Sequence, residues 1–205
     1  ALVIINPNNP TGAVYSRECL TRLAEIAEAN DLVVLSDEIY DQMVYEDAEF
    51  VPMATLCPNA LCATFSGLSK VYRACGYRVG WVAFSGALDR SEDFLRAMDL
   101  LAALRLCSNV PGQWAVQTAL GGFQSIRNLC SKGGRLHESR EAVLNGVERS
   151  DYLTLVAPKG SMYAFIGVNT EKLPGFDDEA FAMELLEQKH VLVAPGSSFN
   201  TDYRS

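Results

Sequence analysis

Short apolar runs alternate with an amphipathic segment in the first part of the chain. The runs cover residues 1–5, 32–35 and 61–65, and each ends at polar or turn-forming residues. Between the first two runs, residues 16–29 place apolar side chains on one helical stripe, made of Leu20, Leu23, Ala24 and Ala27. Strands that alternate with helices predict a parallel sheet, and hence an α/β fold.

A fourth strand is predicted over residues 79–84. Only about a dozen residues separate it from the third run, which is barely enough for the crossover that parallel strands need. We therefore expect this strand to run antiparallel in an otherwise parallel sheet. The pattern then predicts helices at residues 87–106 and 113–129, separated by an interruption at 107–112 that contains Asn, Pro and Gly.

The C-terminal part shows a second series of elements after a glycine-containing loop. The pattern predicts a helix, two strands, a helix and a strand, at residues 135–149, 152–156, 162–166, 178–189 and 191–194. In the second of these helices, Phe181, Leu185 and Leu186 are expected to face inward. We interpret residues 1–134 as part of a large domain, and residues 135–205 as a connecting helix and part of a smaller α+β domain.

The charge balance argues against two classes of binding partner. Seventeen Lys and Arg against 25 Asp and Glu give a net charge of -8, which argues against binding to nucleic acid or to an anionic membrane. No apolar run approaches the ~20 residues that span a bilayer. The first six residues lack the charged lead of a secretion signal. We therefore predict a cytoplasmic protein.

The cysteines do not indicate a metal site. The chain has six cysteines without a CxxC pair, and only His137 and His190 are available as further soft ligands. A chain of this size and apolar content needs no disulfide framework, so we expect scattered, buried free thiols.

Polar side chains follow three of the predicted strands. An Asn- and Pro-containing segment follows the first, Asp37 and Tyr40 follow the second, and Lys70 and Arg78 follow the third. In open parallel sheets, ligands bind beyond the carboxyl ends of the strands. An amide, a carboxylate, a phenol, an amine and a guanidinium are therefore expected to face one crevice.

These segments carry a family resemblance. The motifs are Asn-Pro-x-Asn-Pro-Thr-Gly at 6–12, Asp-x-x-Tyr at 37–40, and Ser-Lys at 69–70 with Arg78 eight residues after the lysine. In this order and spacing the chain resembles the class I/II aminotransferases, pyridoxal-phosphate enzymes of fold type I. The stretch from Lys70 to Trp81 is most similar to bacterial alanine (glutamate-pyruvate) aminotransferases.

The resemblance implies roles around the cofactor ring. Lys70 would form the Schiff base and shuttle the substrate proton. Asp37 would pair with the pyridine nitrogen and keep it protonated, and Tyr40 and Asn9 would hydrogen-bond the 3′-oxygen of the ring. Taken singly, these residues are more often a surface lysine, a helix-capping aspartate, a core-edge tyrosine and a turn asparagine.

The phosphate contacts are implied in the same way, with two departures from the family pattern. Arg78 would clamp the phosphate through its guanidinium fork, and Ser69 would add a hydroxyl. Gly67 stands where many relatives have serine, and Arg73 stands where a small residue is usual. Arg73 would reach either the phosphate or a surface carboxylate, and we favour the carboxylate.

The implied activity is transfer of an amino group between alanine or glutamate and a 2-oxo acid, by a homodimer. Motifs of phosphate-binding loops, dinucleotide-binding folds and serine hydrolases are missing from the sequence. Two alternatives stay open, namely a C-S lyase on the same scaffold and a cofactor-sensing regulatory domain.

The first strand of the chain is of the buried type, and no helix closes the last unit, so we expect segments to be missing at both ends. The family's phosphate loop, ring-stacking aromatic residue and substrate-carboxylate arginine are not found, and Arg204 is not assigned to the last role. We expect these 205 residues alone to be inactive.

Overall fold

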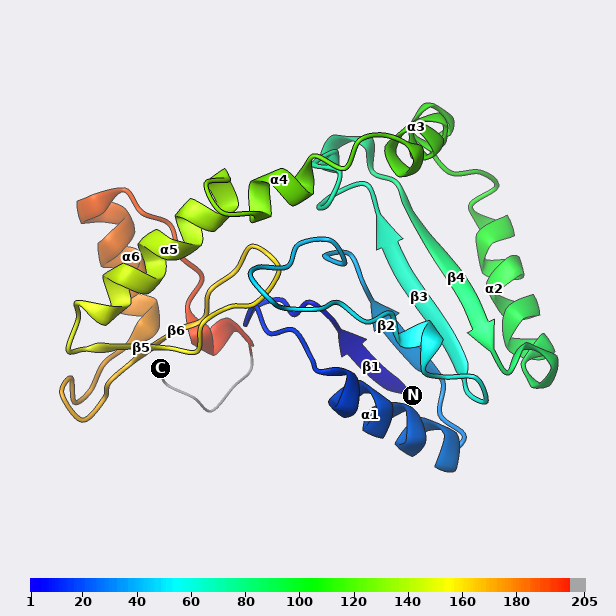
Figure 1. Cartoon of the computed structure of the whole chain (residues 1–205), viewed down its shortest axis with the longest axis horizontal. Helices are drawn as coiled ribbons and strands as arrows, with labels where there is room; N and C mark the ends of the chain where they lie inside the picture. The colour runs from blue at the N-terminus through cyan, green and yellow to red at the C-terminus, as the bar shows by residue number, and fades with distance from the viewer. Residues whose placement is uncertain (200–205) are drawn as a thin grey trace.

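A four-stranded sheet forms the first part of the molecule, in a computed structural model that describes residues 1–199 (Figure 1). Its strands lie side by side in chain order, as β1 (Leu2–Ile5), β2 (Val34–Asp37), β3 (Leu61–Gly67) and β4 (Gly80–Gly86). The first three are parallel, and β4 is antiparallel to β3. The predicted α/β sheet with one antiparallel strand is therefore confirmed.

Strand β2 begins two residues later than the apolar run predicts. The backbone amide of Leu32 donates to the carbonyl of Ala27 at 2.8 Å, so this residue closes the preceding helix instead of joining the sheet. The strand then continues through the polar Ser36 and Asp37. The hydrophobic pattern misses these two positions because their side chains are polar. They belong to the strand because their backbone pairs with both neighbouring strands.

Helix α1 (Arg17–Ala29) covers one face of the sheet. It begins at Ser16, whose side chain accepts a hydrogen bond from the amide of Cys19 at 3.2 Å. Its buried stripe packs against the strands in a core cluster that includes Leu20, Ala24, Ala27, Ile4, Val34 and Cys62. Because side chains alternate along a strand, Val3 points to the opposite face, where it is 65% exposed.

Helices α2 (Glu92–Leu104) and α3 (Val110–Gly121) follow the sheet, and the predicted 113–129 helix is wrong in its bounds. Helix α3 starts at Val110 because the Asn109 side chain accepts a hydrogen bond from the Gly112 amide at 3.1 Å. It ends at Gly121, where the Gln124 amide group donates to the Ala119 carbonyl at 2.9 Å. A separate helix, α4 (Ile126–Cys130), follows.

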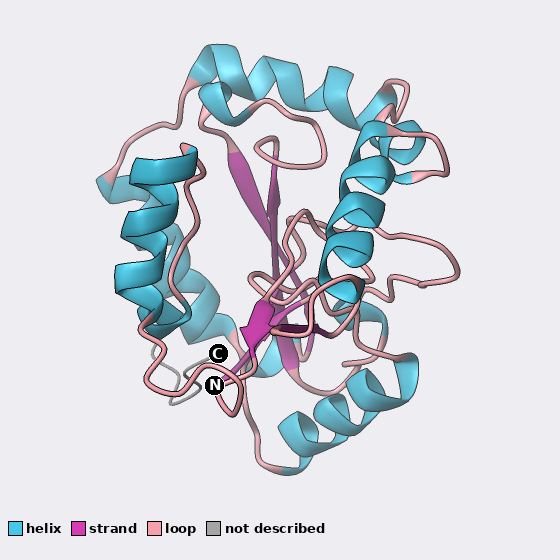
Figure 2. Cartoon of the chain, turned by 90° about the vertical axis from the view of Figure 1, so that its left-hand side faces the viewer, coloured by secondary structure: helices cyan, strands magenta, loops and turns pink. Residues whose placement is uncertain are grey.

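Helix α5 (Arg135–Glu148) confirms the predicted connecting helix and leads to a second sheet. That sheet pairs β5 (Leu153–Leu155) with β6 (Ile166–Val168) in antiparallel orientation. In Figure 1, α4 and α5 run from the first sheet to the second. Figure 2 shows the helices around the outside of the molecule and the strands between them. The division after residue 134 stays a prediction.

Strand β6 starts later than the predicted run at 162–166. The preceding residues are engaged with the first part of the molecule instead: Gly160 forms a β-bridge with Val44, and the Ser161 amide donates to the Met43 carbonyl at 2.8 Å. The predicted strand at 191–194 is wrong, since in the part of the chain that the structure describes it has no partner strand.

Helix α6 (Asp178–Lys189) is present as predicted, but its inward face is only partly right. Ala182 is its buried residue, whereas Phe181 is 46% exposed and Leu186 is 37% exposed. The second sheet has only two short strands, so it offers little surface for these side chains to pack against. Phe181 and Leu185 instead line an apolar cavity.

The expectation of buried thiols is half right. Cys57, Cys62 and Cys130 are buried, whereas Cys19, Cys75 and Cys107 are exposed, and all six are free.

Within residues 1–199, no helix is both long enough and apolar enough to pass through a membrane.

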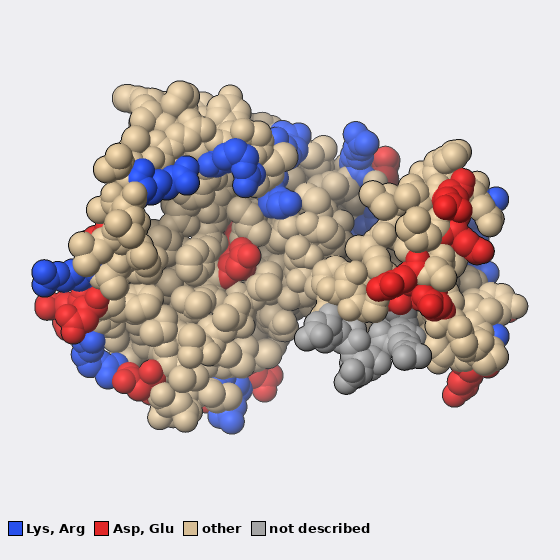
Figure 3. Space-filling model, turned by 180° about the vertical axis from the view of Figure 1, so that it is seen from behind, with Lys and Arg blue, Asp and Glu red and all other residues tan. Residues whose placement is uncertain are grey.

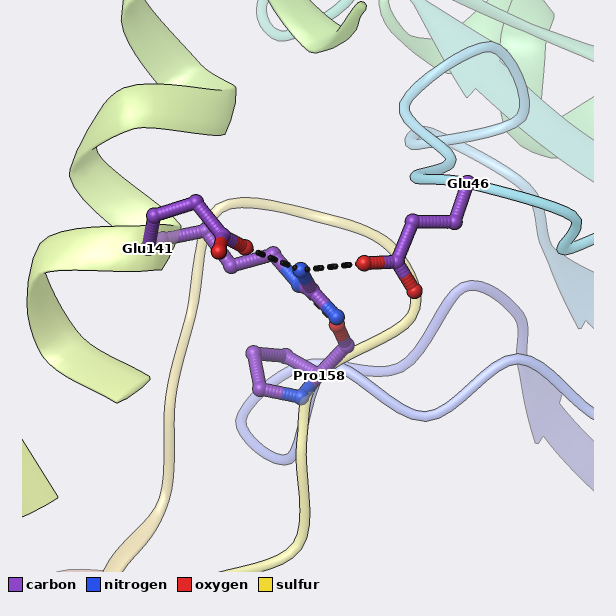
Figure 4. Close-up of polar contacts among 4 residues, drawn as sticks. Glu46, Glu141 and Pro158 are labelled. Carbon is purple, nitrogen blue, oxygen red and sulfur yellow. Dashed lines mark hydrogen bonds and ion pairs between the residues drawn. The ribbon is translucent and has the colours of Figure 1, made fainter. Parts of the chain in front are cut away.

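A buried arginine joins the two parts of the molecule. Arg140 lies on α5 with its side chain only 5% exposed. Its Nε donates to the Pro158 carbonyl at 2.7 Å, and one terminal nitrogen pairs with Glu46 at 3.0 Å and Glu141 at 2.7 Å (Figure 4). The guanidinium also lies 5.5 Å from the ring centroid of Tyr45. One cation thus holds residues from three separate segments.

We expect Arg140→Met to lower the free energy of unfolding by about 1 to 3 kcal/mol, because the buried Pro158 carbonyl loses its donor. Urea unfolding of wild type and variant measures this loss. Arg22→Met is the control, since Arg22 pairs with Glu25 on the surface and should cost no more than about 1 kcal/mol. Equal losses in the two variants would contradict a role for burial.

Candidate functional site

The register of the parallel strands brings the predicted site residues to one edge of the sheet. Ile5 on β1 pairs with Asp37 on β2, and Asp37 pairs with Phe65 on β3. The carboxyl ends of β1 and β2 are therefore level, and β3 continues to Gly67 at the same edge. Asp37 is half-buried, and its Oδ1 accepts from the Ile39 amide at 3.1 Å. In the described residues its second oxygen has no hydrogen-bond partner, so it can receive a proton donor.

Tyr40 is buried beside this carboxylate. Its hydroxyl lies 2.7 Å from the hydroxyl of Tyr163, and the two rings meet edge to face with centroids 5.6 Å apart. Burial raises the pKa of Tyr40 well above its usual range, the Tyr163 hydroxyl and the Asp37 charge add to the rise, and the Asn9 side chain opposes it. Tyr40 is therefore a neutral phenol, able to donate, at physiological pH.

Lys70 follows β3 and reaches the same point. Its Nζ lies 5.9 Å from the centroid of the Tyr40 ring, and the residue is half-buried. The surrounding loop is held by two backbone hydrogen bonds, from Leu68 to Val79 at 3.0 Å and from Ala74 to Leu68 at 2.9 Å. The structure thus brings Asn9, Asp37 and Lys70 together around the phenol of Tyr40, as the sequence predicts.

Ser69 and Arg78 are less closely tied to this group. Arg78 is exposed in a left-handed conformation, with φ 52°, and one terminal nitrogen donates to the Cys75 carbonyl at 2.9 Å. Within residues 1–199, Ser69 makes no side-chain hydrogen bond, and neither residue bonds to another predicted site residue. Their role at a phosphate stays a prediction.

Arg73 does not reach the surface carboxylate that we favoured for it. Its terminal nitrogen donates to the Ser125 hydroxyl at 2.6 Å, so it ties the Lys70 loop to the segment before α4. Among residues 1–199 it pairs with no carboxylate, and a contact with the phosphate stays a prediction. Arg204 lies outside the described residues.

Two hollows adjoin the site. One, of about 460 Å³, lies against the open sheet face and is lined by Val3, Leu35, Asp37, Ile39, Phe65 and Ser66. Seen from behind, the molecule is hollowed on one side, with an acidic side chain inside and basic side chains along one edge (Figure 3). The other hollow is an apolar cavity of about 510 Å³, which Asn9 and Tyr163 line together with residues of the second sheet and α6.

Comparison with known proteins places the whole chain in one family. Residues 1–205 match the family model for aminotransferase class I and II. The chain belongs to the class I and II aminotransferases. The structure also resembles a crystal structure of an aminotransferase from Escherichia coli, with a TM-score of 0.94 and 42% identity over 99% of this chain and 50% of that one.

Curated relatives support the same grouping. Alanine aminotransferase of Mycobacterium tuberculosis strain H37Rv is 46% identical over 98% of this chain and 47% of its own length. Glutamate-pyruvate aminotransferase AlaA of Escherichia coli strain K12 is 43% identical over 97% of this chain and 49% of its own length. The chain thus spans about half the length of the curated relatives it matches. The fold type I architecture predicted from the motifs is confirmed.

Sequence reasoning missed a role for two residues of this aminotransferase chain. The contact of Tyr163 with Tyr40 spans 123 positions, which no local pattern reveals. Glu38 is a buried carboxyl directly after Asp37. Its Oε1 accepts from the Ser36 hydroxyl and from the Met53 amide, each at 2.9 Å, and so fixes the segment that carries Asp37 and Tyr40.

The charge state of Glu38 gives a test based on pH. Burial raises the pKa of Glu38 above its ordinary value of 4.5, although hydrogen bonds from Met53 and Ser36 oppose the rise. The folded protein therefore holds this proton to a higher pH than the unfolded chain does. The stability that this provides is full below pH 4.5 and is lost as the pH rises through the raised value.

We therefore expect Glu38→Gln, which cannot ionise, to gain stability relative to the wild type as the pH rises above 4.5. Urea unfolding at a series of pH values measures the difference in the free energy of unfolding. Exposed Glu49→Gln is the control for loss of one carboxylate. A difference for Glu38→Gln that stays constant or falls with pH would show that Glu38 is already charged when folded.

Proposed function

We propose that the full-length protein is a transaminase that uses pyridoxal phosphate held by Lys70. Its substrates would be alanine or glutamate and a 2-oxo acid such as pyruvate or 2-oxoglutarate. The observation that carries the proposal is the convergence of the Lys70 amine, the Tyr40 phenol and the Asp37 carboxylate at one sheet edge. The names of the relatives, alanine aminotransferase and glutamate-pyruvate aminotransferase, support the choice of substrates.

The donor set of the site fits this cofactor. Pyridoxal phosphate presents an aldehyde, a ring nitrogen, a ring oxygen and a phosphate. The site offers an amine, a carboxylate oxygen that has no hydrogen-bond partner among residues 1–199, and a neutral phenol with an amide beside it. Arg78 has guanidinium nitrogens beyond the one that binds Cys75, and Ser69 has a hydroxyl, for the phosphate. When bound, the cofactor supplies an electron sink for the charge that develops at the substrate Cα.

Lys70 has two tasks in this proposal. Its primary amine holds the cofactor covalently, and the amine that the substrate displaces then takes the proton from the substrate Cα. The Tyr40 ring lies 5.9 Å from Nζ and forms a wall that limits where the amine can move. A proton acceptor confined in this way needs less reorganisation to reach the reacting carbon.

Asp37 and Tyr40 set the charges on the ring. A carboxylate next to the ring nitrogen stabilises the protonated nitrogen, and the unshared oxygen of Asp37 is placed to do so. Tyr40, which burial keeps protonated, donates to the ring oxygen, and Asn9 adds its amide group. A homodimer and a cytoplasmic location remain predictions.

We expect borohydride reduction of the loaded full-length protein, followed by peptide mapping, to place the pyridoxyl label on the peptide that contains Lys70. Lys70→Ala should lose the label, because Lys70 is the lysine whose amine lies over the Tyr40 ring in residues 1–199. Lys159→Ala is the matched control, since Lys159 binds Gly12 and Tyr45 through its backbone amide and carbonyl. A label on Lys159 or Lys132 in the wild type would refute the assignment.

We expect Asp37→Asn to retain the cofactor but to lower the rate of single-turnover transamination by about 100-fold or more, because a neutral amide cannot hold the ring nitrogen protonated. Asp41→Asn is the control, a half-buried carboxyl four positions away. Wild-type rates in Asp37→Asn would show that another group builds the electron sink. Release of sulfide from cysteine instead of transamination would favour the C-S lyase.

A further inference from the structure

The segment that carries Tyr163 is fastened to the loop that carries Asn9. The backbone amides of Lys159 and Gly160 both donate to the Gly12 carbonyl, at 2.8 and 2.9 Å. The Ser161 hydroxyl donates to the Asn8 carbonyl at 3.0 Å. Gly12 has φ 71°, and a Cβ there would lie 2.7 Å from the Tyr163 carbonyl oxygen, so only glycine allows this approach. The position of Tyr163 at the site is therefore fixed by a tightly packed backbone.

Only one of the two phenols can donate its proton to the other. A phenol has one O–H to donate and can accept from others, so at 2.7 Å either Tyr40 donates to Tyr163 or Tyr163 donates to Tyr40. If Tyr40 donates to Tyr163, it has no proton left for a ligand. If Tyr163 donates, the O–H of Tyr40 is free to point away from Tyr163, into the site.

An anionic oxygen in the site decides between these two arrangements. Hydrogen bonds to a charged acceptor are roughly twice as strong as those between neutral groups, so the Tyr40 proton turns to the charged oxygen. Tyr163 then becomes the donor to Tyr40. Successive bonds in such a chain polarise and strengthen one another. The other ionisable groups that face the Tyr40 phenol are Asp37 and Lys70.

We propose that Tyr163 is a positioning residue that donates its hydroxyl proton to Tyr40 and so directs the Tyr40 O–H to the ring oxygen of pyridoxal phosphate. This inference rests on the proposed function, because it requires the cofactor on Lys70. A ring oxygen that receives a stronger hydrogen bond is a weaker acceptor for the neighbouring proton on the Lys70 nitrogen. Tyr163 thus lowers the pH at which that nitrogen loses its proton.

The test is a titration of the absorbance of the loaded full-length protein against pH, without substrate. We expect Tyr163→Phe to raise the midpoint by a few tenths of a pH unit, as one hydrogen bond in the chain loses about 10–30% of its strength. Tyr40→Phe should raise it further. In the Tyr40→Phe background, Tyr163→Phe should add nothing, because the residue acts through Tyr40.

Tyr45→Phe is the matched control. Tyr45 is also buried, and its hydroxyl donates to the Ser161 carbonyl at 2.8 Å, so it joins the same two segments through a hydrogen bond that does not involve the Tyr40 hydroxyl. An unchanged midpoint in this variant would support the proposal. The same upward shift in Tyr45→Phe as in Tyr163→Phe would show that Tyr163 acts only by joining the two segments, and would overturn the proposal.

The remaining outcomes separate this inference from the proposed function. A midpoint in Tyr163→Phe that stays the same or falls, while the wild type shows a titrating band that depends on Lys70, overturns the inference alone. A falling midpoint would mean that Tyr163 competes for the Tyr40 proton. A wild-type protein without a Lys70-dependent band overturns the proposed function, and the inference with it.

Discussion

Parallel pairing of three strands is the constraint on which the site depends. The register pairs Ile5 with Asp37 and Asp37 with Phe65, and because the strands are parallel, the loops that follow leave the sheet at the same edge. An amide, a carboxylate and an amine from distant parts of the chain thereby come together without any long side chain reaching across the fold. A shift of one residue in β2 would turn Asp37 to the other sheet face.

Polar contacts, beside an apolar cluster that includes Tyr40, Ile126 and Leu136, join this edge to the second part of the molecule. Tyr40 meets Tyr163, Tyr45 meets Ser161, and Arg140 gathers Glu46 and the Pro158 carbonyl. Hydrogen bonds of this kind require defined distances and angles, whereas apolar packing tolerates sliding. The second part can therefore hold a hydroxyl at a fixed place beside the reaction site while its own cavity stays open.

The sequence predicts the elements of the first sheet and four of the residues that converge, because periodicity and motif spacing are local properties. It places β6 too early, since residues 160–163 are drawn into contacts with Met43 and Val44 that lie far away in the chain. The Tyr40–Tyr163 pair is missed for the same reason. The partner of Arg73 is missed because Ser125 lies 52 positions away in the chain.

The antiparallel course of β4 has a consequence for protein engineering. Gly67 and Gly80 are paired neighbours, and Leu68 and Val79 are joined by a backbone hydrogen bond, so the loop that carries Lys70 leaves and re-enters the sheet at one point. A loop from another member of the family can therefore replace it without changing the strand register on either side, provided that the replacement keeps the contact with Ser125 and a buried apolar residue at position 71.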